Sequence, residues 1–94
     1  AAPDSLAREA AMLDRARALL GTDPAGALAA LDAHAAAYPA GRMSLEREVL
    51  AIETLRRLHR FSEARARGES LLRRDPGSIY ADRVRAILAT LPAP

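Results

Sequence analysis

Cysteine, lysine and tryptophan are all absent from this chain of 94 residues. Without cysteine the protein has no disulfide, no thiolate nucleophile and no zinc–thiolate site, whichever compartment it occupies. Aromatic residues are nearly as scarce, because Tyr38, Phe61 and Tyr80 are the full set. No apolar run approaches the roughly 20 residues that a helix needs to span a bilayer. These absences exclude thiol chemistry and a membrane-spanning helix within these residues.

The residues that are abundant favour helices. Half of the chain is apolar, and most of that half is alanine and leucine, which are strong helix formers. Strands draw on β-branched and aromatic residues, which are few here. All 14 basic residues are arginine, a bias typical of GC-rich bacterial genomes. A net charge of +2 is too small to indicate nucleic acid by itself. We therefore predict one all-α domain over residues 1–94.

Turn residues divide the chain into five predicted helices. Asp23-Pro24 is typical of a helix start, since aspartate caps the first amides and proline tolerates the first helical position. Gly21, Pro39, Gly41 and the Asp75-Pro76-Gly77 run end helices. The predicted helices cover about 4–20, 24–38, 43–59, 62–74 and 78–91, with Asp4 or Ser5, Ser62 and Ser78 as further caps.

The helices repeat along the chain. Pro39 and Pro76 lie 37 residues apart, as do Ala27 and Ala64. The segments 43–52 and 78–87 align with each other as "MSLEREVLAI" and "SIYADRVRAI". Repeated helices joined by loops of unequal length are typical of a helical solenoid. We predict one repeat over about 4–39, a second over about 42–76 and a capping helix over about 78–91.

The segment "LHRFSEA" at 58–64 resembles the "LGxYxEA" pattern of the tetratricopeptide repeat. Ala64 takes the small position where two helices cross, and Pro76 takes the closing proline. His59 replaces the usual glycine, and Gly68 stands where a bulky residue is typical, which suggests a close approach of a neighbouring helix. The resemblance implies a right-handed solenoid of about five antiparallel helices, or two and a half hairpins.

The junctions at Tyr38-Pro39 and at Asp75–Ser78 resemble those of a bacterial subset of these repeats. That subset includes the periplasmic repeats of the Tol–Pal coordinator and of outer-membrane assembly lipoproteins. The stretch at 27–52 also resembles C-terminal domains of myxobacterial anti-sigma-like membrane proteins. The resemblance implies a periplasmic or other extracytoplasmic location, with the cytoplasm left open. We expect these residues to be a domain excised from a larger envelope protein.

Residues suited to catalysis are spread out. His34 and His59 fall in different predicted hairpins, whereas a metal or general-base site needs several groups in one cleft. Glu46 and Glu53 share a helix face, but nearby arginines favour exposed ion pairs. The serines stand mostly at helix starts, where capping explains them. We expect no catalytic residue, no cofactor and no metal site.

Arginines at 56, 57, 60, 65, 67, 73 and 74 are the strongest surface signal. Arginine suits carboxylate and phosphate ligands, but a basic patch with no base-reading motif argues only weakly for nucleic acid. An acidic protein or peptide is the favoured partner. In tetratricopeptide arrays the first helix of each hairpin lines a groove for partners. The resulting partner-binding candidates are Asp14, Arg17, Glu46, Glu53, Arg56, Arg57 and Arg60.

These features predict a non-catalytic interaction or scaffold domain. A sensor domain of an anti-sigma-like membrane regulator is one alternative. Binding of anionic lipid or nucleic acid through the arginines is another. The domain is expected to be a monomer or a weak homodimer, and an exposed Leu88 beside Leu91 would indicate the dimer.

Overall fold

The computed structural model describes residues 3–93, which form five α-helices. No strand occurs within this range, so the all-α prediction is confirmed. The helices are α1 (Pro3–Leu20), α2 (Pro24–Ala37), α3 (Ser44–Arg57), α4 (Phe61–Arg74) and α5 (Ala81–Ala89).

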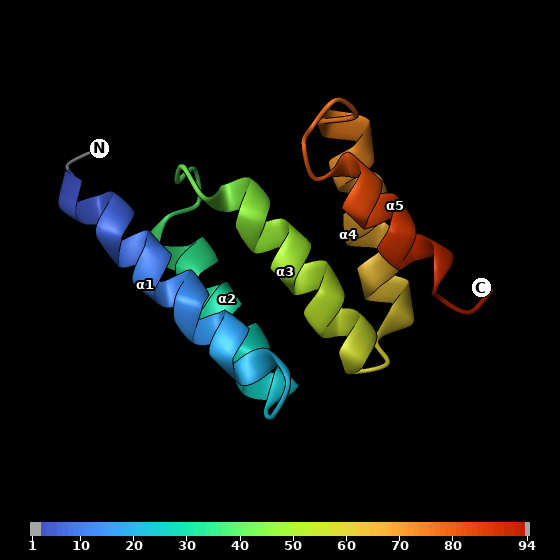
Figure 1. Cartoon of the computed structure of the whole chain (residues 1–94), viewed down its shortest axis with the longest axis horizontal. Helices are drawn as coiled ribbons and strands as arrows, with labels where there is room; N and C mark the ends of the chain where they lie inside the picture. The colour runs from blue at the N-terminus through green and yellow to red at the C-terminus, as the bar shows by residue number, and fades with distance from the viewer. Residues whose placement is uncertain (1–2, 94) are drawn as a thin grey trace.

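The helix α3 is the centre of the molecule (Figure 1). It lies between the hairpin of α1 and α2 on one side and the pair of α4 and α5 on the other. Each helix packs on the next in the chain, and α3 also contacts both α1 and α5. The whole measures 42 × 31 × 18 Å, so the helices form a slab that is one to two helices thick.

The core consists of two apolar clusters that meet at α3. Toward the first hairpin, Leu50 and Ala51 pack against residues of α1 and α2. Toward α4 and α5, the opposite side of α3 contributes Val49, Ile52 and Leu55. A helix that is buried on both sides is apolar all round. In α3 this holds for one turn, residues 49–52, which supplies both clusters. The buried apolar residues of the two clusters are Leu13, Ala16, Leu31, Leu50 and Ala51, and Leu28, Val49, Ile52, Leu55, Ala64, Leu71, Val84, Ile87 and Leu91.

The predicted cap of α2 is confirmed, and the other predicted caps are wrong. Asp23 Oδ1 accepts a hydrogen bond from the amide of Gly26 at 3.0 Å, with proline at the first helical position. Asp4 and Ser5 lie inside α1, which begins before them. Ser62 lies inside α4, whose capping position is Arg60. Ser78 Oγ accepts from the amide of Tyr80 in a turn that precedes α5, so this helix begins three residues later than the serine.

The structure has a special backbone conformation or a close contact at each of the two positions, 59 and 68, that depart from the tetratricopeptide pattern. His59 has a φ of 59°, in the left-handed region where glycine is favoured. Gly68 is buried against Leu88 of α5, and a Cβ at position 68 would lie 2.7 Å from Leu88 Cδ2. The expected close approach of a neighbouring helix at this glycine is therefore confirmed.

Candidate functional site

Three helices border a shallow hollow of about 300 Å³. Its apolar residues are Leu20 of α1, Val49 and Leu50 of α3, and Tyr80 just before α5. Its charged residues are Arg17, Glu46 and Arg83. We call this hollow the α1/α3/α5 groove. The mixture of apolar surface and charge in an open depression suits a segment of another protein better than a small molecule, which usually needs a deeper pocket.

The structure brings together three of the predicted partner-binding residues beside this groove. Arg17 donates to Asp14 Oδ1 at 2.7 Å within α1. Its second terminal nitrogen donates to Glu46 across the seam between α1 and α3. We expected Glu46 to form an ion pair with an arginine close to it in sequence. The observed partner is instead 29 residues away, because packing of α1 on α3 places Arg17 opposite it.

The other predicted partner-binding residues lie around the C-terminal end of α3. Arg56 donates to both carboxylate oxygens of Glu53 at 3.1 and 2.5 Å, and Arg57 Nε lies 3.5 Å from Glu53 Oε1. The hydrogen bond from Arg56 lowers the pKa of Glu53, although burial of the carboxylate acts in the opposite sense. Arg60 pairs with Glu63 in the next turn. These residues are therefore engaged with local carboxylates in the free chain.

The same pairing extends over the predicted arginine set. Four of its seven members form ion pairs, namely Arg56, Arg57, Arg60 and Arg67. Arg65 donates to the carbonyl of Pro92 at 2.5 Å, and Arg74 to that of Ser70 at 3.4 Å. Carboxylates beside these guanidinium groups reduce the positive charge that an anionic ligand would meet.

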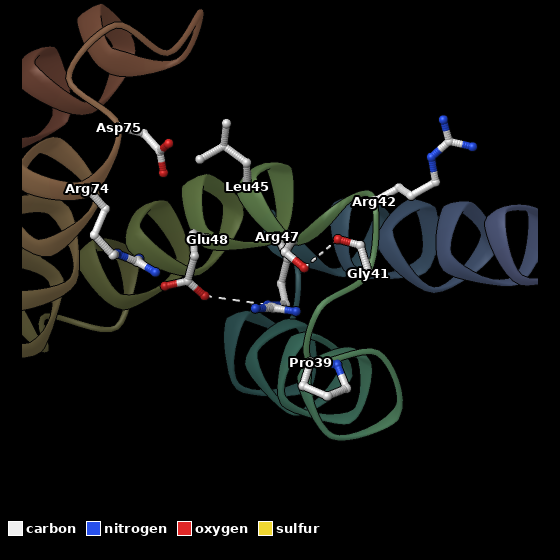
Figure 2. A pocket seen from close by; sticks show the side chains of 9 residues that line it. Pro39, Gly41, Arg42, Leu45, Arg47, Glu48, Arg74 and Asp75 are labelled. Atoms are coloured by element: carbon white, nitrogen blue, oxygen red, sulfur yellow. Dashed lines mark hydrogen bonds and ion pairs between the residues drawn. The ribbon is translucent and has the colours of Figure 1, made fainter. Parts of the chain in front are cut away.

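A second hollow, of about 490 Å³, lies where the loop between α2 and α3 approaches the end of α4. Figure 2 shows Arg74 and Glu48 extending toward each other from α4 and α3, whereas the guanidinium group of Arg42 points away. Arg47 and Asp75 also line this cleft, so its charge is mixed. The cleft was not predicted, because its residues come from two stretches, 39–48 and 74–75, that only the fold brings together. Those residues are Pro39, Gly41, Arg42, Ser44, Leu45, Arg47, Glu48, Arg74 and Asp75.

Behind the cleft is a buried polar cluster that the sequence analysis missed. His34 on α2 is fully buried, Glu9 on α1 is 2% exposed and Arg47 on α3 is 8% exposed. His34 Nε2 lies 3.0 Å from Glu9 Oε1, and Arg47 Nη1 lies 3.3 Å from His34 Nδ1. One signal in the sequence could have revealed it. Glu9 precedes Leu13 by four residues and His34 follows Leu31 by three, so both fall on apolar stripes.

The polar cluster continues through Glu48 to α4. Arg47 Nε donates to Glu48 Oε2 at 3.4 Å, and Arg67 donates to both oxygens of Glu48 at 3.1 and 2.8 Å. Burial raises the pKa of Glu48, but the hydrogen bonds and charges of Arg67 and Arg47 outweigh it and leave the pKa below its ordinary value. Glu9, His34, Arg47, Glu48 and Arg67 thus form one connected series from α1 to α4.

The two histidines lie in different surroundings. His59 is exposed in the turn before α4 and stacks on Phe61 with ring centroids 5.3 Å apart, whereas His34 is buried between α1 and α3. Among residues 3–93, no three side chains of the types His, Asp and Glu gather closely enough to hold a metal ion. Within the same range, no helix has both the length and the apolar character to cross a membrane.

Leu88 is not exposed, so the feature that would have indicated a homodimer is missing. Leu91 is buried in the second apolar cluster, and Leu88 packs against that cluster while half-buried. The large apolar side chains that are exposed in the described residues are Leu6, at 39%, and Ile79, at 88%. They lie at the start of α1 and in the turn before α5.

Comparison with known proteins gave no relatives. No family model matches the chain, and searches of curated proteins and of solved structures found no match.

Proposed function

We propose that this chain is a non-catalytic protein-interaction domain that binds a segment of another protein in the α1/α3/α5 groove. The observation that carries the proposal is the composition of this groove, in which three helices from separate parts of the chain supply one continuous surface. Leu20, Val49, Leu50 and Tyr80 offer apolar contact, and Arg83 stands beside them with no carboxylate partner among the described residues. An apolar side chain followed by a carboxylate is the ligand chemistry that fits.

The order of helix contacts supports a tetratricopeptide-like arrangement. Each helix packs on its neighbour in the chain, and α3 bridges to α1 and α5 as the first helices of stacked hairpins would. We propose on this basis that the chain is two and a half repeats, with α5 as the capping helix. We further propose that it belongs to a larger bacterial envelope protein and acts outside the cytoplasm, as the sequence resemblance implies.

A binding experiment tests the groove directly. The chain is immobilised and exposed to envelope extract, the captured protein is identified, and its affinity for purified variants is measured. The groove variant is Tyr80→Ala/Arg83→Ala. The matched control is Arg56→Ala/Arg57→Ala/Arg60→Ala, which removes more charge from a surface outside the groove.

The two variants separate the outcomes. Removal of a buried aromatic contact and of a charge pair should weaken binding by about 100-fold or more if both are central to the interface. Loss confined to the groove variant supports the proposal. Loss confined to the arginine variant moves the site to the end of α3 and refutes the groove. Wild-type affinity in both variants refutes both surfaces.

Anionic lipid or nucleic acid remains the second candidate ligand, with the arginines as its site. The ion pairs of Arg56, Arg57, Arg60 and Arg67 argue against it, since each would have to be broken or shared on binding. Flotation with vesicles of anionic lipid, repeated at two salt concentrations, distinguishes it from protein binding because such contacts weaken steeply with salt.

A further inference from the structure

The hydrogen-bond partners of His34 favour one tautomer of its ring. Arg47 Nη1 approaches His34 Nδ1 at 3.3 Å, and a guanidinium group can only donate. His34 Nδ1 must therefore accept, which leaves the ring proton on Nε2, where it is donated to Glu9 Oε1 at 3.0 Å. This neutral tautomer satisfies both ring nitrogens of His34, which has no contact with solvent.

The partners on either side of His34 are held in different ways. On the α1 side, Glu9 also accepts from the amides of Arg42 and Met43 at 3.3 and 3.4 Å. These backbone donors fix the carboxylate in place. Gly41 makes this approach possible, since a Cβ there would lie 2.7 Å from Glu9 Cδ. The carboxylate therefore has little room to move away from His34.

On the α3 side, Arg47 borders open space. It donates to the carbonyl of Tyr38 at 3.3 Å and to Glu48 at 3.4 Å, and it lines the cleft of Figure 2. Rotation of its side chain would carry the guanidinium group into that cleft and keep the contact with Glu48. The ring of Tyr38 completes the surroundings of His34, with ring centroids 5.6 Å apart.

We propose that Glu9, His34 and Arg47 form a proton-operated side-chain switch between α2 and α3. A second proton on His34 can bind only at Nδ1, on the lone pair that Arg47 now occupies. The new N–H then opposes the N–H of Arg47, and two positive charges face each other. The imidazolium pairs with Glu9, which is fixed, and Arg47 moves into the cleft beside Glu48.

The consequence is a weaker junction between α2 and α3. Arg47 leaves both His34 of α2 and the carbonyl of Tyr38, the residue that follows α2. The apolar contacts of Leu31 with the α3 residues Leu50 and Ala51 remain. Protonation therefore loosens the end of the junction nearest the loop between α2 and α3, and the fold persists.

The first test is nitrogen-15 NMR of the wild-type chain between pH 8 and pH 5, the range in which histidine commonly changes its charge. At pH 8 we expect the His34 signals to report the Nε2–H tautomer. As His34 gains its second proton, the Arg47 Nε signal should shift with the same midpoint, and amides of residues 38–47 should exchange faster. His59, which is exposed and distant from Arg47, serves as the internal reference.

Two results overturn the proposal. One is an Arg47 signal that stays constant while His34 titrates. The other is a His34 that keeps a single proton until the whole chain unfolds.

Variants give an independent test. Arg47→Met removes the group that the switch moves, so amide exchange at residues 38–47 should lose the pH dependence seen in the wild type. The control, Arg85→Met, breaks an exposed pair with Asp82 and should keep that dependence. Acid-dependent exchange at residues 38–47 that persists in Arg47→Met would refute the switch.

Discussion

Gly68 on α4 faces Leu88 on α5 so closely that a methyl group on the glycine would lie 2.7 to 3.2 Å from three carbon atoms of the leucine. α5 has only nine residues, too few to be stable as an isolated helix. The stability of α5 therefore depends on close packing against α4. Glycine disfavours the helix by about 1 kcal/mol relative to alanine, and this contact explains why it is tolerated.

Gly68→Ala should destabilise the protein in spite of its better helix propensity. Overpacking a close contact costs about 1–3 kcal/mol, which exceeds the propensity gain, so we expect a net loss of up to about 2 kcal/mol in urea unfolding. Gly21→Ala is the matched control, because a Cβ there meets nothing within 4 Å. It should be neutral or slightly stabilising. If the clash is the cause, Gly68→Ala should cost less in a Leu88→Ala background than in the wild type.

Glu9→Ala should be among the most destabilising substitutions on α1. It would leave the Nε2–H group of His34, and the amides of Arg42 and Met43, without the acceptor that they share. A buried donor left without its acceptor costs about 1–3 kcal/mol. The control, Asp14→Ala, removes a carboxylate that is 72% exposed on the same helix and should change stability by less than about 1 kcal/mol. Equal effects in thermal unfolding would show that the buried cluster contributes little.

The helices were predictable from the sequence because alanine, leucine and turn residues determine them locally. Asp23-Pro24 is the best case, since a cap and a fixed φ act within three residues. The caps at Ser62 and Ser78 were predicted wrongly because local sequence does not decide where those helices begin. Arg60 occupies the capping position of α4 without a side-chain hydrogen bond, so packing of Phe61 and Ala64 on the core decides where this helix begins.

The candidate site was less accessible to prediction, because its contacts join distant parts of the chain. Arg17 and Glu46 were both predicted as partner-binding residues, but their pairing depends on how α1 packs on α3. The buried cluster was missed because His34 sits among alanines in sequence, and nothing local indicates a carboxylate 25 residues earlier. Charged residues on apolar stripes are the one general signal for such clusters, since burial without a partner would be costly.

His59→Gly should stabilise the protein. His59 adopts a φ of 59°, a conformation that costs a residue with a Cβ about 1–2 kcal/mol. Loss of the stacking contact with Phe61 offsets part of the gain, so we expect a net increase of about 0.5–1 kcal/mol in the free energy of unfolding. His59→Val should lower it, because a β-branched residue fits this region worst. The reverse order of the two variants in urea unfolding would contradict the role assigned to this turn.

Glu48 should make the stability of the protein depend on pH in the acidic range. Its pKa in the folded chain lies below the ordinary value of 4.5, since Arg67 and Arg47 outweigh the effect of burial. Protons therefore bind the unfolded chain more readily at this site. The stabilisation is complete above about pH 5 and is lost as the pH falls through the folded value.

The difference in unfolding free energy between wild type and Glu48→Gln should accordingly be about 1–3 kcal/mol at pH 7, the range for hydrogen bonds to charged groups. The difference should shrink steadily below pH 5. Glu69→Gln is the control, since Glu69 is exposed and has no arginine partner among the described residues. A wild-type advantage over Glu48→Gln that is the same at pH 3 as at pH 7 would exclude the ion pair with Arg67 as its source.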